Sequence, residues 1–261
     1  MGERQQGARD EVPIVAQLDA PIEPYDRHEE IWSAVQRVEA HTMVTRHRLA
    51  VTYQIAVFAE LHGLSGSFVE CGTWKGGASG LLALANLRHG ATRRNLHLFD
   101  SFSDMCLPDE AIDGNLAVQQ ARDLGGVIGP LDGSLTPMDG FYQSLGGHAT
   151  VNDVHSLLID TLNYDSEFLF VHEGWFQETI PVQRESIGPI AVLRLDSDFY
   201  RGTRFCLEML FDQVVEGGFV IIDDYGCYQG CQRAVDEFLA QQNLPHYLNH
   251  IDAEGRYLIK R

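Results

Sequence analysis

Residues 190–198 read IAVLRLDSD, an apolar run that ends in two carboxylates, Asp196 and Asp198. A second apolar run, GGFVIIDDY at residues 217–225, also ends in an acidic pair. Runs of this length are typical of strands that are buried on both faces, as in a parallel sheet. Parallel strands end at the same edge of their sheet, where open α/β folds bind their ligands. The sequence therefore predicts an α/β protein with four aspartates at one rim of the sheet.

Four carboxylates at that density would repel one another and raise one another's pKa. A bound hard cation removes this conflict, and a ligand set made only of oxygens suits Mg²⁺. The alternative is that Asp223 and Asp224 cap the next helix while Asp196 and Asp198 point into solvent. Because two predicted buried strands end in the same acidic pattern, we favour a metal site.

The composition limits the possible partners. The chain has 261 residues, enough for one large α/β domain, and a formal net charge of −18. That charge argues against nucleic acid and against an anionic membrane surface as partners. No apolar stretch approaches the roughly 20 residues of a membrane span, and we find no signal-peptide core. The five cysteines show no framework spacing, which fits a reducing compartment, so we expect a cytoplasmic protein.

The chain divides into an N-terminal arm with a helix, residues 1–40, and a main domain, residues 41–261. Helical spacing of apolar residues continues to about Glu60, with a break near residues 41–43. Residues 103–150 are rich in Gly, Pro and Asp and show little periodicity. A stretch of this length in a compact domain is typical of a lid or an insertion over a site.

A glycine-rich loop follows the first predicted strand, SFVECG at residues 67–72, and a helix follows the loop. This order is typical of nucleotide-binding proteins, because glycines let a ligand approach the backbone at a helix N-terminus. The spacing differs from GxGxxG, which counts against a dinucleotide. Glu70 at the strand end would repel a pyrophosphate and attract a cationic or amino-bearing ligand. A tight turn without a ligand is the alternative.

Asp100 ends the next predicted strand, NLHLFDSF at residues 95–102. A carboxylate in this position commonly holds a ribose diol, and a helix cap is the alternative role.

The later elements complete the predicted sheet. Residues 168–176 predict a third strand with its exit loop, and residues 201–215 predict the helix between the two acidic strands. Residues 230–242 predict another helix, and residues 246–251 and 256–260 predict a terminal antiparallel hairpin.

These motifs together resemble the macrocin O-methyltransferase family, which methylates deoxysugar hydroxyls in antibiotic pathways. The resemblance covers roughly residues 40–243, in family order, through residues 68–77, 100–102, 174–176, 195–200, 218–225 and 231–237. It implies the class I S-adenosylmethionine-dependent methyltransferase (Rossmann-like) fold, with a seven-stranded, mostly parallel sheet, an antiparallel C-terminal hairpin and helices on both faces. It also implies S-adenosylmethionine and Mg²⁺ as cofactors, a small-molecule sugar acceptor and a homo-oligomer of at least two chains.

The resemblance assigns roles to individual residues. Asp196, Asp223 and Asp224 would bind the metal, and Asp198 would be the general base. The methyl donor would be held by Thr42, Met43, Glu70, Gly72, Thr73, Gly77, Asp100, Ser101, Glu173, Gly174 and Trp175. Within that set, Thr42 and Met43 match a stretch that closes over the donor's methionine end, and residues 173–175 would lie near the adenine.

The resemblance is weakest in residues 103–150, where SDMC at residues 103–106 replaces a Pro-rich family sequence. Acceptor-binding lids come from this region, so the sequence leaves the acceptor open between an antibiotic-linked and a nucleotide-linked deoxysugar. A catechol-type O-methyltransferase acting on a phenol is the closest alternative. An NAD-dependent oxidoreductase and a non-enzymatic sugar- or metal-binding module are the alternatives from other classes.

Overall fold

Seven strands form one sheet in the order β3-β2-β1-β4-β5-β7-β6 in the computed structural model, which describes residues 28–242 and 246–261. The strands are β1 (Ser67–Cys71), β2 (Leu96–Asp100), β3 (Leu169–Glu173), β4 (Ile190–Leu195), β5 (Val214–Ile222), β6 (Asn249–His250) and β7 (Arg256–Ile259). The first five are parallel, and β7 runs antiparallel to β5 and β6. This confirms the predicted fold class, including the C-terminal hairpin.

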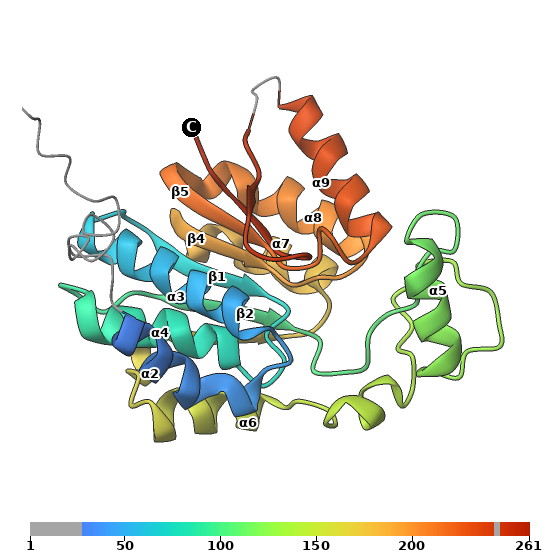
Figure 1. Ribbon diagram of the computed structural model, residues 1–261, viewed down its shortest axis with the longest axis horizontal. Coiled ribbons are helices and arrows are strands. Elements are labelled where there is room, and N and C mark those ends of the chain that lie inside the picture. The colour runs from blue at the N-terminus through green and yellow to red at the C-terminus, as the bar shows by residue number, and fades with distance from the viewer. Residues whose placement is uncertain (1–27, 243–245) are drawn as a thin grey trace, which may run out of the picture.

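Helices cover both faces of the sheet (Figure 1). The side chains of adjacent strand residues belong to two separate hydrophobic cores, one on each face. Phe68 of β1 packs with one set of helices, whereas the next residue, Val69, packs with the other. The first set is α2 (His28–Val38), α3 (Arg46–Leu61), α4 (Gly77–His89) and the helical stretch of α6 (Val151–His155) and η3 (Ser156–Thr161). The second set is α7 (Phe176–Ile187), α8 (Tyr200–Leu210) and α9 (Gln229–Gln241). Helix α5 (Gly114–Asp123) lies to one side of the sheet and adds Ala117 and Ala121 to the same core. Strands buried on both faces explain the unbroken apolar runs of the sequence.

The predicted break between the first two helices is present. The chain passes from α2 through a 3₁₀ turn, η1 (Glu39–His41), into a non-helical segment before α3. The side chain of Thr45 begins α3 as its N-cap by accepting a hydrogen bond from the Arg48 amide. Most of the predicted N-terminal arm precedes residue 28 and lies outside the described residues. Within the two described ranges, no helix is both long and apolar enough to cross a membrane.

Two helices were not predicted. Helix α5 lies inside the segment that we expected to be an irregular insertion, and it buries only Ala117 and Ala121. Two small residues give almost no periodic signal. Helix α7 contains Pro181, a residue that normally breaks or ends a helix and so hides this one in the sequence. The helix predicted at residues 201–215 also ends earlier, at Leu210, because β5 already begins at Val214.

Candidate active site

The carboxyl ends of β4 and β5 bring three of the four predicted aspartates together. One carboxylate oxygen from each of Asp196, Asp198 and Asp224 lies within 4.8 Å of the other two. The backbone fixes this arrangement, because the Asp196 amide donates to the Cys71 carbonyl at 2.8 Å, at the end of β1. Such a group of oxygens has the composition and spacing to hold a hard divalent cation.

Asp198 adopts an unusual backbone conformation at this rim. Its φ is 57°, in the left-handed region, and its amide donates to Asp224 Oδ2 at 3.2 Å. Burial, followed by the charges of neighbouring carboxylates such as Asp196, raises the pKa of Asp198 well above its ordinary value of 3.8. Burial and the Asp198 charge do the same for Asp224. Strained residues with raised pKa values are typical of functional sites.

Asp223, predicted as a metal ligand, is held differently from the other three aspartates. Its Oδ1 accepts a hydrogen bond from Arg194, and its Oδ2 accepts one from Arg48. Both guanidinium groups are almost completely buried, with side chains 1% and 8% exposed. Burial raises the pKa of Asp223 to about 6, although the two arginines oppose the shift. The structure thus groups Asp198, rather than Asp223, with Asp196 and Asp224, because two arginines bind both oxygens of Asp223.

Arg194 connects this rim to Glu70. Its Nη1 donates to Glu70 Oε1 at 2.7 Å and to Asp196 Oδ2 at 2.9 Å. The second oxygen of Glu70 accepts the Ser79 hydroxyl. Burial raises the pKa of Glu70 to about 7, and Arg194 limits that rise. In this structure the Glu70 carboxylate therefore orients Arg194 and the start of α4, and its contact with a ligand amino group stays a prediction.

Sequence reasoning missed the roles of Arg194 and Arg48. Arg194 offered a signal, because an arginine inside an apolar strand must find carboxylate partners when it is buried. Arg48 offered none, since its partners on the C-terminal turn lie more than two hundred residues away.

Asp100 shapes the glycine-rich loop. Its Oδ2 accepts hydrogen bonds from the amides of Thr73 and Trp74, both at 2.8 Å. Its Oδ1 accepts one from the Phe102 amide at 2.8 Å. Trp74 and Phe102 have φ values of 45° and 48°, and these bonds hold them in that rare conformation. The Asp100 carboxylate thus fixes the loop, and its contact with a ribose stays a prediction.

Gly72 allows β1 and β4 to meet at the rim. Its φ is 91°, and a Cβ built on it would overlap the Asp196 carbonyl oxygen. We expect Gly72→Ala to destabilise the protein by about 3 kcal/mol, from overpacking and an unfavourable φ. Thermal and urea denaturation measure this loss. Gly129→Ala is the matched control, because nothing lies within 4 Å of that Cβ. Equal stability of the two variants would contradict the prediction.

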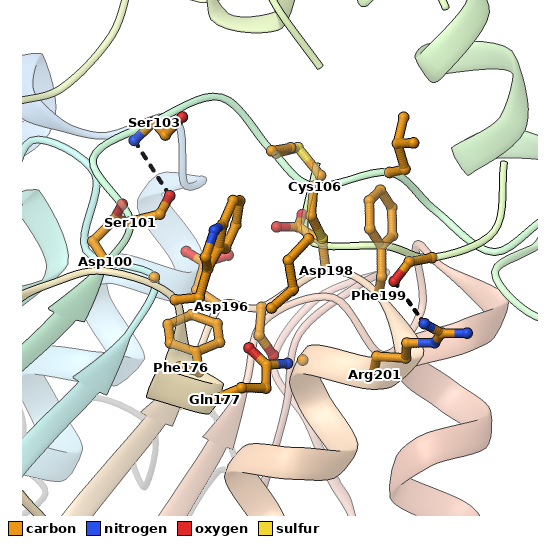
Figure 2. A pocket seen from close by; sticks show the side chains of 18 of the residues that line it. Asp100, Ser101, Ser103, Cys106, Phe176, Gln177, Asp196, Asp198, Phe199 and Arg201 are labelled. Atoms are coloured by element: carbon orange, nitrogen blue, oxygen red, sulfur yellow. Dashed lines mark hydrogen bonds between the residues drawn. The ribbon is translucent and has the colours of Figure 1, made fainter. Parts of the chain in front are cut away.

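Two cavities meet at this rim, and Gly72, Asp196 and Asp198 line both. The first encloses about 80 Å³ and is the one shown in Figure 2. The second encloses about 210 Å³. The predicted donor residues that line the first cavity are Gly72, Asp100, Ser101, Gly174 and Trp175, and those that line the second are Thr42, Met43, Glu70, Gly72 and Thr73.

Gly77 and Glu173, which were also predicted to contact the donor, are not among the described residues that line either cavity. Gly77 instead lies against the segment that follows η1, since a Cβ there would meet Thr42 Cβ at 2.6 Å. Glu173 is exposed at the end of β3.

The segment expected to be a lid forms one wall of the first cavity through Leu135 and Tyr142. The Tyr142 amide donates to Asp104 Oδ1 at 3.0 Å, which anchors this wall. Lys75 Nζ of the glycine-rich loop donates to the Gly146 carbonyl at 2.7 Å, so the wall also contacts that loop. Burial and the charge of Asp198 raise the pKa of Tyr142, and its phenol therefore stays neutral and can donate a hydrogen bond.

The sequence profile of the macrocin O-methyltransferase (TylF) family matches residues 18–125 and 153–260. The 8-demethyl-8-(2,3-dimethoxy-alpha-L-rhamnosyl)-tetracenomycin-C 4'-O-methyltransferase of Streptomyces olivaceus is 29% identical over 218 residues, covering 83% of this chain and 74% of that enzyme. The demethyldecarbamoylnovobiocin O-methyltransferase of Streptomyces niveus is 30% identical over 220 residues, covering 84% of this chain and 75% of that enzyme. The solved structure of the O-methyltransferase NovP superposes with a TM-score of 0.67 at 29% identity, covering 84% of this chain and 82% of NovP.

The profile covers both acidic strands and the glycine-rich loop, and it omits residues 126–152, which include the Tyr142 wall. The resemblance stated from the motifs is thereby confirmed, and the oxidoreductase and non-enzymatic alternatives are excluded. The chain is a sugar O-methyltransferase and belongs to the macrocin O-methyltransferase family.

Proposed function

We propose that this enzyme transfers the methyl group of S-adenosylmethionine to a deoxysugar hydroxyl, with Mg²⁺ bound at the acidic rim. The observation that carries the proposal is the junction of two cavities at Asp196 and Asp198. A methyl donor and an acceptor must meet within bonding distance of a base, and a junction of this kind supplies that place.

The donor would lie across both cavities. Its methionine end would occupy the second cavity beside Thr42, Met43 and Glu70, and its adenosine end would reach Asp100 and Ser101 in the first. The sulfonium carries a positive charge, which the surrounding carboxylates stabilise.

The group of carboxylates at the rim fits Mg²⁺, because three of them converge. Burial and mutual repulsion raise the pKa values of at least two of the three. Asp196 and Asp224 would be two of the metal ligands, and the third would be either Asp223 or Asp198. A bound divalent cation lowers the pKa of a hydroxyl group that lies against it. Asp198, which lines both cavities, would accept the proton of the acceptor hydroxyl.

The first cavity favours a sugar that is already linked to an antibiotic over a nucleotide-linked sugar. Among the described residues that line it, Arg201 is the one cationic side chain, and it already pairs with Asp109 at 3.4 Å. A diphosphate needs unoccupied cationic or amide groups. The apolar lining, which includes Met105, Leu135 and Phe199, suits an uncharged aglycone. The names of the tetracenomycin and novobiocin relatives agree with this acceptor class.

Asp198 and Asp224 should make the stabilising effect of Mg²⁺ depend on pH. Because the folded state raises their pKa, the cation-free protein loses stability as the pH rises above their ordinary value of 3.8. Mg²⁺ competes with protons for the same oxygens. We therefore expect Mg²⁺ to raise the melting temperature more at about pH 8 than at about pH 5. Differential scanning fluorimetry with and without Mg²⁺ measures this, and equal shifts at both pH values would contradict it.

The proposed reaction is tested by mass spectrometry with S-adenosylmethionine, Mg²⁺ and a panel of glycosylated antibiotics, nucleotide-linked deoxysugars and catechols. We expect a gain of one methyl group on a glycosylated antibiotic and none on the nucleotide-linked sugar. Transfer only to catechols would establish the catechol-type alternative. Transfer only to nucleotide-linked sugars would keep the reaction and overturn the acceptor class.

A further inference from the structure

One side of the second cavity is lined by two segments that are far apart in the sequence. Thr42, Met43 and Val44, in the non-helical stretch between η1 and α3, line the cavity on this side. Glu254, in the turn between β6 and β7, lines it as well. We call residues 42–45 the strap and residues 252–254 the C-terminal turn.

The side chain of Asp252 links the strap to the C-terminal turn, and its two carboxylate oxygens bind different partners. Oδ1 accepts hydrogen bonds from the amides of Glu254 and Gly255 at 2.9 and 2.8 Å, which hold the turn itself. Oδ2 accepts the Thr45 hydroxyl at 2.8 Å and Arg48 Nε at 3.1 Å, which hold the strap and the start of α3. The division means that one oxygen can be changed without removing the function of the other.

The opposite end of the strap is fixed by packing. Helix α4 begins at Gly77, where a Cβ would meet Thr42 Cβ at 2.6 Å and the His41 carbonyl oxygen at 2.7 Å. The strap is therefore closely packed against α4 at its first residue and hydrogen-bonded to Asp252 at its last. Release of the Asp252 bonds would leave the strap held by its packed first residue and by the N-cap that Thr45 forms on α3.

We propose that Asp252 is a positioning residue that keeps the strap closed over the bound methyl donor and thereby sets the rate at which donor and product leave. The proposal rests on the proposed function, which places the methionine end of the donor in the second cavity. Asp252 itself is not among the described residues that line that cavity. It acts through Thr45 and Arg48.

The substitution Asp252→Asn keeps the hydrogen bonds within the turn and removes those to the strap. The amide oxygen of asparagine can still accept the two turn amides, as in Asx turns. Its NH₂ group cannot accept a hydrogen bond from Thr45 or Arg48. Arg48 keeps its bonds to Asp223 and to Glu254 Oε2, the latter at 2.6 Å, so the acidic rim stays intact.

The test uses S-adenosylhomocysteine as the probe, because its binding requires no knowledge of the acceptor. We expect Asp252→Asn to release the probe about tenfold faster than the unchanged chain, a factor that corresponds to about 1.4 kcal/mol. Stopped-flow displacement measures the release rate, calorimetry gives the Kd, and thermal denaturation checks the fold. Thr45→Ser retains the hydroxyl that caps α3 and binds Asp252, and it should behave as the unchanged chain.

Asp212→Asn is the matched control, because it removes an equally charged but exposed partner, that of Arg184. A release rate of Asp252→Asn within twofold of the unchanged chain would overturn the role of Asp252 while leaving the donor site in place. Faster release that appears only together with a lower melting temperature would mean a structural role and would also overturn it. Failure of the unchanged chain to bind the probe would overturn the donor site and the strap together.

Discussion

Asp198→Asn should lower the rate of methyl transfer about 10³-fold while the protein still binds S-adenosylhomocysteine and Mg²⁺. A sugar hydroxyl is almost fully protonated at neutral pH, so its attack on the donor requires a group that accepts the proton. Asp198 lines both cavities, and its backbone amide donates a hydrogen bond to Asp224 Oδ2. Asparagine has nearly the same shape and tolerates the left-handed φ of 57° at this position.

Single-turnover methyl transfer, with binding of donor and cation measured separately by calorimetry, tests this expectation. Asp196→Asn is the informative comparison, because loss of a metal ligand should weaken Mg²⁺ binding and should be partly restored by high Mg²⁺. Full activity of Asp198→Asn would remove Asp198 as the base. Loss of Mg²⁺ binding in Asp198→Asn, in parallel with Asp196→Asn, would instead assign Asp198 as a ligand, as the grouping of its oxygens with Asp196 and Asp224 allows.

The acidic rim could be predicted from the sequence because the residues that form it are adjacent in the chain to the strands that position them. Each of β4 and β5 is an apolar run followed at once by its aspartates, and the parallel sheet brings such ends together. The arginine partners of Asp223 could not be predicted in the same way. Arg48 lies 175 residues from Asp223 in the chain, and only the packing of α3 beside the sheet brings the two together.

The acceptor side was the least predictable part of the site. Helix α5 and the Tyr142 wall lie in a stretch where small and polar residues hide the periodicity, and the family profile omits most of that wall. The position of Tyr142 depends on a buried carboxylate, Asp104, that binds backbone amides at Gly140 and Tyr142. Contacts of a side chain with a distant backbone leave no regular spacing in a sequence.

Removal of Mg²⁺ by excess EDTA should abolish methyl transfer, by about 10³-fold or more, without unfolding the protein. Without the cation, the acceptor hydroxyl keeps its ordinary pKa, and the carboxylates of Asp196, Asp198 and Asp224 repel one another. The fold should persist, because the two hydrophobic cores lie on the faces of the sheet and the arginines already neutralise Asp223.

Methyl transfer and the circular dichroism spectrum should therefore respond differently to the chelator. We expect activity to disappear, the circular dichroism spectrum to stay unchanged, and activity to return when Mg²⁺ is added in excess. EDTA already saturated with Mg²⁺ is the control for effects of the chelator itself. Transfer that continues at the full rate in excess EDTA would rule out the metal-assisted scheme. Asp198 and the donor would then have to carry the reaction, and the clustered carboxylates would need another explanation.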